Sequence, residues 1–276
     1  MIKLGSAALA TSLAICVWAG AAKAGEVLDR VLEAKTVTVA VGTDWGPMSH
    51  MDENHELVGY DVDVAKQIAE SLGVKVKFVT PGWDLIAAGK WEGRWDIAMG
   101  QMTPTKERAE KLDFPGTYMW GPSSAIVHKD SKVTKLSDLE GKVVGVSAGT
   151  TPEAYANHNF TPSWLNARPI TYQFKPGEVK TYGSSNIAFD DLRLGDGVRL
   201  DAVLADTTLA NDAIKAGYPL KILEPALYNS PGDVVVQHGD KEFSEKVAAA
   251  IKKMQDDGTL TKLSLKWYGA DYSKEQ

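Results

Sequence analysis

WDIAMGQMTPTKER, residues Trp95–Arg108, joins a strand pattern to the start of a helix. Backbone N–H groups at a helix start and a guanidinium one turn later can converge on a single carboxylate. The same residues could instead form a capped surface helix, with Thr103 as N-cap, Pro104 at the first helical position and Arg108 in solvent. The stretch therefore predicts either an anion-binding turn or an ordinary helix start.

The chain before this stretch alternates between strand and helix patterns. Apolar residues recur at helical spacing from Tyr60 until Gly73 stops the repeat. Around this helix we expect strands at Val37–Val41, Val74–Val79 and Asp96–Met99, a polar hairpin tip at His50–Leu57 and a short helix at Trp83–Ala88. The order β-α-β-α-β with helical crossovers predicts a parallel sheet.

The same alternation restarts after residue 140. We expect strands at Lys142–Val146 and Leu200–Leu204, and helices at Thr151–Asn157, Asn186–Leu194 and Thr208–Ala216. Two similar α/β units therefore follow one another along the chain.

Two extended stretches connect these units. Ser124–Val127 leads out of the first unit, and Asp233–Gln237 leads back to it, ahead of helices at Lys241–Gln255 and Thr259–Tyr268. A chain that crosses twice makes the second unit an insertion in the first, and the paired crossovers form a hinge. We therefore predict an α/β fold with two Rossmann-like lobes joined by two extended hinge strands. Lobe 1 is expected at residues 25–124 and 234–276, lobe 2 at 125–233, and the ligand in the cleft between them.

Residues 1–24 have the order of charge, apolar core and small residues that is typical of a secretory signal peptide. Lys3 precedes an apolar run over residues 7–22, and small residues flank the site after Ala24. We expect cleavage there. Cleavage would also remove Cys16, the only cysteine, and leave the mature chain without disulfides.

The net charge of the chain limits the classes of partner that it can bind. The formal net charge is −6 at pH 7, and loss of the two leader lysines makes it about −8. No basic cluster that could follow a phosphate backbone is present in the sequence, so we expect no nucleic-acid partner. The remaining length of roughly 250 residues suffices for two compact domains.

Short segments in a specific order carry a family resemblance. They are VGTD at 41–44, LVGYDVDVA at 57–65, MT and ER within 102–108, LDF at 112–114, LSDLEG at 136–141, GTT at 149–151 and DAVLAD at 201–206. Through them, nearly the whole mature chain resembles the family 3 periplasmic solute-binding proteins of ABC importers, the polar amino acid binding type. The resemblance implies a type II clamshell in the periplasm, a bound amino acid or related zwitterion, and the membrane permease of an ABC importer as partner. It also implies a monomer with no cofactor and no catalytic activity.

The resemblance also implies roles for four polar residues. In the family, the ligand α-carboxylate is bound by the arginine matching Arg108, helped by the threonine matching Thr103 and the helix start matching Thr151. The α-ammonium is held by the acid matching Asp206, which here follows an apolar strand, at the carboxyl end where α/β sheets bind ligands. Asp206 could instead be the N-cap of the next helix, and one carboxylate can do both.

Four other positions are expected to select the ligand side chain. Aromatic residues matching Trp45 and Trp83 sandwich that side chain in family members, although either ring could be buried in the core. The chain departs from the family pattern after the first strand, where Asp44 and Trp45 lie, and Gln101 replaces a residue that is usually glycine. These departures favour a small or unusual amino acid. Because ring faces attract cations, an opine or a quaternary ammonium compound is an alternative ligand.

An enzyme is the main alternative class, because some relatives of this fold are secreted dehydratases, and Asp44 could then act as the acid or base. The chain contains no Gly-x-Ser-x-Gly elbow, no His-Glu-x-x-His helix and no phosphate-cradling glycine loop. A membrane-attached sensor module would need an apolar span after Tyr268, and the tail there is short and polar. These observations favour a free-standing carrier.

Two polar stretches are left open by the sequence. His50, Asp52, His55 and Glu56 could form a metal cluster, but their position at a hairpin tip favours solvated turn residues. The stretch His158–Gly183 is longer than the connection in the family, and the sequence does not place it inside or outside the cleft.

Overall fold

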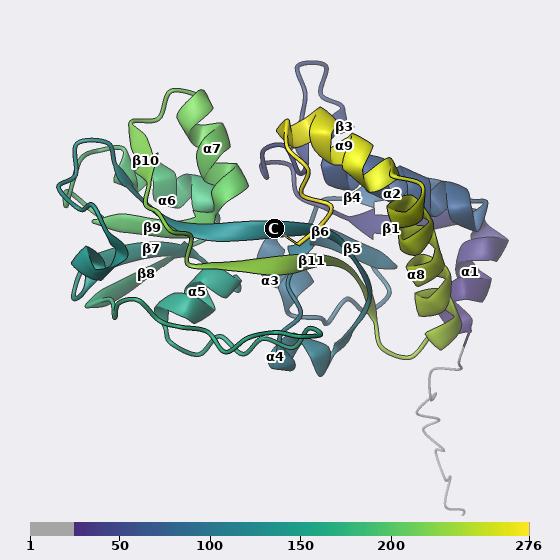
Figure 1. Cartoon of the computed structure of the whole chain (residues 1–276). Coiled ribbons are helices and arrows are strands. Elements are labelled where there is room, and N and C mark those ends of the chain that lie inside the picture. Colours follow the sequence, from purple (N-terminus) through teal and green to yellow (C-terminus); the bar gives the residue numbers. More distant parts are fainter. Residues whose placement is uncertain (1–24, 276) are drawn as a thin grey trace, which may run out of the picture.

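The computed structural model describes residues 25–275 (Figure 1). Two lobes, each a set of parallel strands covered by helices, share one sheet with the order β4-β1-β5-β11-β6-β9-β7-β8, and β10 pairs with β6. Its strands are β1 (Thr36–Ala40), β4 (Lys75–Val79), β5 (Ile97–Met102), β6 (Leu112–His128), β7 (Val143–Ser147), β8 (Glu178–Tyr182), β9 (Ala202–Asp206), β10 (Leu220–Ile222) and β11 (Tyr228–Gln237). The predicted two-lobed α/β fold is confirmed.

Lobe 1 is built on β1, with β4 and β5 parallel to it on either side. Its helices are α1 (Glu26–Ala34), α2 (Tyr60–Leu72), α3 (Trp83–Ala87), α4 (Lys106–Ala109), α8 (Lys241–Asp256) and α9 (Thr259–Tyr268). Helix α8 buries Phe243, Val247 and Ile251, spaced four residues apart, in the same core as the strand residues Val37 and Val39. Each fully buried side chain of this size contributes about 1.5–3 kcal/mol, so the returning chain completes the core of lobe 1.

Lobe 2 repeats the arrangement around β7, which lies parallel to β8 and β9. Its helical elements are a 3-10 turn (Leu136–Leu139), α5 (Thr151–Ala156), α6 (Ser185–Leu192) and α7 (Thr207–Lys215). Separate hydrophobic clusters form on the two faces of this part of the sheet, one with Val144 and Leu204, the other with Phe189 and Val203. Successive strand residues point to opposite faces, which is why Val203 and Leu204 belong to different clusters.

The two hinge strands are long and antiparallel. β6 and β11 pair from Leu112 opposite Gln237 to Ser123 opposite Tyr228, and β6 then pairs with β9 in lobe 2. The ladder shifts register between Gly232 and Asp233. The sheet predicted as parallel is therefore parallel within each lobe, and antiparallel where the hinge strands join the lobes.

The structure of the stretch Trp95–Arg108 differs in detail from the prediction. β5 continues to Met102, so Gln101 lies within the strand, and the N-cap of the short helix α4 is Thr105, whose side chain accepts the Arg108 N–H at 3.2 Å. Thr103 as the N-cap was wrong. The strand continues because β11 pairs with it as far as Met102, through Asp233.

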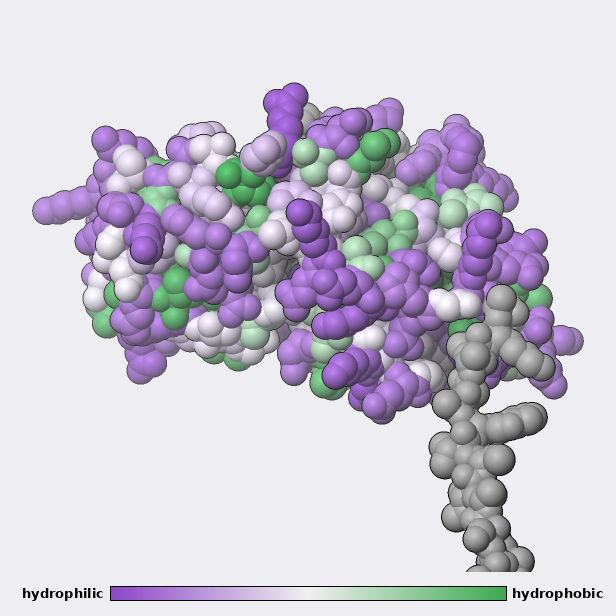
Figure 2. All heavy atoms as spheres, turned by 90° about the horizontal axis from the view of Figure 1, so that it is seen from below, coloured by the Kyte–Doolittle hydropathy of each residue, from purple (hydrophilic) through white to green (hydrophobic). Residues whose placement is uncertain are grey.

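The polar hairpin tip is present as β2 (His50–Met51) and β3 (Leu57–Val58). On the face shown in Figure 2, hydrophilic side chains predominate and hydrophobic ones form small, separate patches. Within residues 25–275, no helix is long and apolar enough to cross a membrane. The predicted signal peptide and its cleavage site lie outside the residues that the structure describes.

Candidate ligand-binding site

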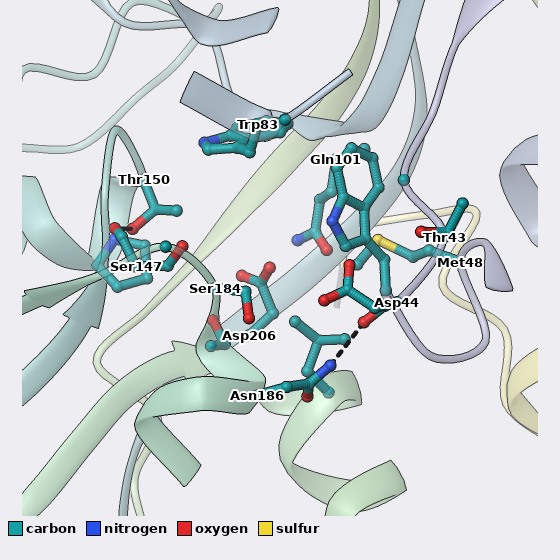
Figure 3. A pocket seen from close by; sticks show the side chains of 18 of the residues that line it. Thr43, Asp44, Met48, Trp83, Gln101, Ser147, Thr150, Ser184, Asn186 and Asp206 are labelled. Atoms are coloured by element: carbon teal, nitrogen blue, oxygen red, sulfur yellow. Dashed lines mark hydrogen bonds between the residues drawn. The ribbon is translucent and has the colours of Figure 1, made fainter. Parts of the chain in front are cut away.

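A cavity of about 240 Å³ lies between the lobes. Its walls come from the ends of β1, β5, β7 and β9 and from the turns that follow them. Seven of the eight sequence candidates line it: Asp44, Trp45, Trp83, Gln101, Arg108, Thr151 and Asp206. Figure 3 shows the side chains of Asp44, Gln101 and Asp206 pointing into the same space, with Trp83 on one side of it and Thr150 and Ser147 on another.

Arg108 is held rigidly at this cavity. It is 8% exposed, and its guanidinium donates to the carbonyl oxygen of Thr103 and to the carbonyl oxygen of Gly149, both at 2.8 Å. The guanidinium carbon also lies 5.6 Å from the centre of the Trp83 ring. Two acceptors and one ring face therefore fix the orientation of the planar fork before any ligand contacts it.

The charge of Arg108 has no carboxylate partner within salt-bridge distance in the described part of the chain. Burial lowers the pKa of Arg108 to about 10, so the group stays protonated at neutral pH. A buried guanidinium that is bonded only to neutral carbonyls keeps donors for an anion. The turn can therefore act as a carboxylate receptor.

The two threonines expected beside Arg108 are placed differently. Thr151 is the first residue of α5 and lines the cavity. Thr103 is 2% exposed, does not line the cavity, and its hydroxyl lies 3.1 Å from the Ser230 hydroxyl on β11. Its contact with Arg108 is made by its backbone carbonyl, so Thr103 positions the arginine.

Asp206 ends β9 on the opposite wall. It occupies the N-cap position of α7, but its side chain makes no capping hydrogen bond. Its carboxylate accepts a hydrogen bond from Ser123 at 3.2 Å, because β6 pairs these two residues. Burial raises the pKa of Asp206 to about 6, and the Ser123 bond and the Arg108 charge pull the other way. The carboxylate therefore faces the cavity, and the capping alternative is wrong.

The two tryptophans are half-buried and meet edge to face. Their ring centres are 5.6 Å apart at an interplanar angle of 80°. The indole N–H of Trp83 also donates to the Gly149 carbonyl at 3.2 Å, across the cleft. Both rings pack against a lobe 1 core cluster, Trp45 also packs against a cluster built mainly from lobe 2, and both rings line the cavity, so neither is wholly a core residue.

Gln101 fills the base of the cavity. Its backbone has φ = 51°, in the left-handed region, and its side chain is 7% exposed. A Cβ added at Gly121 or Gly232 would lie 2.3 Å or 2.6 Å from Gln101 side-chain atoms, so these two hinge glycines make room for the glutamine. No protein partner within residues 25–275 bonds to the buried side-chain oxygen of Gln101. An acceptor of this kind is costly to bury unless something donates to it.

Asp44 is exposed at the mouth of the cavity. Its backbone carbonyl accepts a hydrogen bond from the Asn186 amide at 2.7 Å, drawn as a dashed line in Figure 3, which links lobe 1 to α6. Other lining residues were not singled out in the sequence: Thr43, Met48, Ser147, Thr150, Ser184, Asn186 and Leu209. Ser147 ends β7, so the rule that parallel strands present ligand groups at their carboxyl ends could have found it.

The polar residues His50, Asp52, His55 and Glu56, considered as a possible metal cluster, lie at the turn of the β2–β3 hairpin. Asp52 accepts backbone hydrogen bonds from Asn54 and Glu56, both at 2.8 Å, and these bonds lower its pKa. In the part of the chain that the structure covers, no group of three or more His, Cys, Asp and Glu residues could hold a metal ion.

Comparison with known proteins points to one family. Residues 37–270 match the bacterial extracellular solute-binding proteins, family 3. The L-cystine-binding protein of Escherichia coli is 32% identical over 251 residues, covering 90% of this chain and 88% of that protein. The ABC transporter arginine-binding protein 1 of Escherichia coli is 27% identical over 242 residues, covering 85% and 91% of the two chains.

Solved structures agree with these matches. An ancestral arginine-binding protein bound to arginine has a TM-score of 0.72 and 33% identity, covering 85% of this chain and 99% of that one. An ancestral amino acid-binding protein, described as a precursor of cyclohexadienyl dehydratase, has a TM-score of 0.75 and 31% identity, covering 88% and 100%. From the matched span, the fold and the cleft, the chain belongs to family 3 of the bacterial extracellular solute-binding proteins.

Proposed function

We propose that this protein captures an amino acid or amino-acid-like zwitterion in the periplasm and delivers it to the membrane permease of an ABC importer. One observation carries the proposal. Arg108, a buried cation without a carboxylate partner in the described chain, lines the same cavity as the Asp206 carboxylate. Two opposite charges on facing walls match the two charges of a zwitterion, and ionic hydrogen bonds to charged groups are the strong ones.

In this proposal Arg108 binds the ligand carboxylate, with Thr151 beside it and Thr103 holding the guanidinium through its carbonyl. Asp206 binds the ammonium, and the unpaired oxygen of Gln101 is a second acceptor for its N–H groups. Micromolar affinity corresponds to about −8 kcal/mol, which two such clamps with aromatic burial can supply after the cost of lobe closure.

The charge balance of the cavity limits the class of ligand that it can bind. Its lining includes two acids, Asp44 and Asp206, and one base, Arg108. A net negative cavity favours a ligand with a net positive charge, as arginine has. Cystine is neutral overall, because its second ammonium comes with a second carboxylate, so it gains only from a contact of that ammonium with Asp44. Relatives named for arginine and L-cystine support this choice. Trp45 and Trp83 would then cover the side chain, with Asp44 near its far end.

The domain boundaries follow from the cores. We place lobe 1 at residues 25–124 and 234–276, and lobe 2 at 125–233. In support, one hydrophobic cluster of lobe 1 combines residues such as Val31 and Val64 with residues such as Val247 and Leu260, whereas one cluster of lobe 2 contains only residues between Ala125 and Tyr228. We further propose that the signal peptide is cleaved after Ala24 and that the carrier acts as a monomer.

Binding without chemistry is the favoured activity. The matched relatives described above are named as binding proteins, and the cavity holds no nucleophile with a histidine beside it. One enzymatic alternative is an elimination reaction with Asp44 as the acid or base, because the chain resembles an ancestral precursor of a dehydratase. Turnover assays on any ligand that binds would reveal it.

A thermal-shift screen tests the proposal directly. The mature chain, refolded to remove carried-over ligand, would be heated with L-arginine, L-cystine, L-histidine, L-glutamine, octopine or glycine betaine. A ligand at 100 times its Kd stabilises the folded state by about 2.7 kcal/mol, which appears as a rise of a few degrees in Tm. We expect the largest shift with a cationic or diammonium amino acid and none with glycine betaine. A chain that responds to none of the amino acids would contradict the proposal.

A further inference from the structure

The long connection between α5 and β8, residues 157–177, spans from lobe 2 to lobe 1. It has no regular secondary structure, and in Figure 1 it runs out below the sheet toward α4 and back. At its far end, Lys106 N–H donates to the Thr161 carbonyl and Ser163 N–H donates to the Pro104 carbonyl, both at 3.1 Å. Thr105 and Pro162 form the antiparallel bridge between these two bonds. Backbone pairing therefore ties the connection to lobe 1.

The base of the connection is fastened to lobe 2. Phe174 belongs to a lobe 2 core cluster, and the Tyr155 hydroxyl of α5 accepts the Gln173 N–H at 2.9 Å. His158 stacks on Tyr172 with ring centres 4.2 Å apart, and its Nε2 lies 2.9 Å from the Phe174 carbonyl. These contacts make the segment part of lobe 2, so the lobe 1 pairing must break if the lobes separate.

The segment pairs with the residues that hold Arg108. Thr103 accepts from the Arg108 guanidinium, the Thr105 hydroxyl accepts its backbone N–H, and Pro104 and Lys106 make the two bonds to the connection. The carboxylate receptor is thus supported from outside by the other lobe. A second cavity, of about 450 Å³, lies behind it, lined by Arg108, α5 and by Phe160 and Thr161 of the connection.

We propose that residues 157–177 form an interlobe clasp, which biases the two lobes toward the closed state and holds the turn that carries Arg108. The two lobes are then joined by three connections, namely the hinge strands β6 and β11 and the clasp. Because the clasp closes through backbone groups and not through the ligand, it acts on the empty protein as well. Its effect on ligand release rests on the proposed function, whereas its effect on lobe separation does not.

Lys106→Pro tests the clasp at a single bond. Lys106 is the first residue of α4, where proline is well tolerated because that N–H has no partner inside the helix. The preceding Thr105 has φ = −124° and ψ = 160°, the extended conformation that a residue before proline requires. The substitution therefore deletes the bond to Thr161 and keeps the helix. Lys106→Ala, which keeps the N–H, is the matched control.

The measurement is the distance between spin labels on Glu33→Cys in lobe 1 and Asp196→Cys in lobe 2, both exposed, in the ligand-free protein. We expect a longer-distance population in Lys106→Pro and none in Lys106→Ala. With L-arginine as probe, if the screen shows that it binds, release should be roughly three to ten times faster in Lys106→Pro, the effect of one hydrogen bond. Identical distance distributions in both variants would overturn the clasp, even if ligands bind normally.

A disulfide provides an independent test. Thr105 and Pro162 are a non-hydrogen-bonded antiparallel pair, whose Cα atoms lie about 4.5 Å apart, within the range that a disulfide can bridge. Thr105→Cys with Pro162→Cys should oxidise readily and lower the radius of gyration of the ligand-free protein, and reduction should reverse both effects. Because label cysteines would interfere with this disulfide, the protein carries no spin labels in this test and small-angle scattering measures the radius of gyration. Failure of the pair to oxidise would show that the clasp is open in solution and would contradict the proposal.

Discussion

The guanidinium of Arg108 donates a 2.8 Å hydrogen bond to the carbonyl oxygen of Gly149 on the opposite lobe. The Trp83 indole donates to the same oxygen, at 3.2 Å. Gly149 has φ = 71°, in the left-handed region, and the turn it makes leads directly into α5. One carbonyl therefore fixes the carboxylate receptor of lobe 1 against the helix start of lobe 2, so binding at Arg108 and closure of the lobes are coupled by geometry.

Arg108→Ala should abolish ligand binding and leave the protein folded. Removing one partner of a buried ionic hydrogen bond typically costs 2–5 kcal/mol, so we expect affinity to fall by about 30-fold to several thousand-fold. Titration calorimetry with the ligand from the thermal-shift screen measures the change, and circular dichroism checks the fold. The control is Arg199→Ala, an exposed arginine of lobe 2 outside both the cavity and the clasp. Normal affinity in Arg108→Ala would show that the carboxylate is bound elsewhere.

Asp206→Asn should weaken zwitterions and leave ligands without an ammonium comparatively unaffected. The charge of Asp206 also predicts a pH dependence, because its pKa in the empty protein is raised to about 6. A bound ammonium favours the ionised form and lowers that pKa, so affinity is full above pH 6 and falls as the carboxyl is protonated below it. Titrations at pH 5 and pH 7.5 measure the slope, which should vanish in Asp206→Asn. Equal losses for both ligand classes would exclude the ammonium role.

Gly121→Ala should disturb the cavity only while Gln101 is present. The three atoms nearest to the added methyl group would all belong to the Gln101 side chain, the closest at 2.3 Å. We expect a loss of about 1–3 kcal/mol in unfolding free energy from overpacking, together with weaker binding. In a Gln101→Gly background, which also suits φ = 51° at that position, the same methyl group should be tolerated. A double-mutant cycle by urea unfolding measures this coupling, and simple additivity would contradict it.

Asp61→Asn should stabilise the protein at alkaline pH. The carboxyl is buried, with one oxygen bonded to the Tyr118 hydroxyl at 2.8 Å and the other without a partner within residues 25–275. Burial raises the pKa of Asp61 to about 7, so between pH 4 and 7 the folded state binds more protons than the unfolded state. Stability contributed by the protonated form is therefore present below pH 4 and is lost as pH rises through 7.

Urea unfolding at pH 5 and pH 8 measures this effect. Asp61→Asn should lose less stability between the two values than the natural chain, and the remaining slope should come in part from Asp233, whose pKa burial also raises to about 7. The exposed Asp196→Asn is the control and should leave the slope unchanged. A steeper slope in Asp61→Asn would show that Asp61 is ionised in the folded state.

Much of the fold could be predicted because it follows from local patterns. The helical repeat after Tyr60 became α2 and ended at Gly73, as expected, because glycine takes the left-handed φ of 71° at the helix end. The strand before Asp206 was equally clear, since buried strands are continuous apolar runs. The extent of β5 was missed because its last residues are held by pairing with β11, more than 120 residues later.

The candidate site, like the fold, could be predicted from the sequence only in part. Arg108 and Asp206 lie at the ends of elements whose order along the chain was readable, so their meeting in one cavity follows from the topology of the sheet. Thr103 was expected to contact the ligand, but it follows the end of β5, where β11 pairs with Met102, and its hydroxyl lies against Ser230 of β11. Ser184 and Asn186 were not singled out, because nothing local marks a helix start that faces another lobe.

The sequence by itself determined the two α/β units, their double connection and the charged residues at strand ends, because strand and helix periods and turn residues act over short distances. Only the tertiary structure decided where residues 157–177 lie, how Gln101 fits against Gly121 and Gly232, and that Arg108 and Trp83 meet at Gly149. These are contacts between distant segments, made largely through backbone atoms that every residue shares. Such groups leave no mark in a sequence, and the folded packing alone chooses their partners.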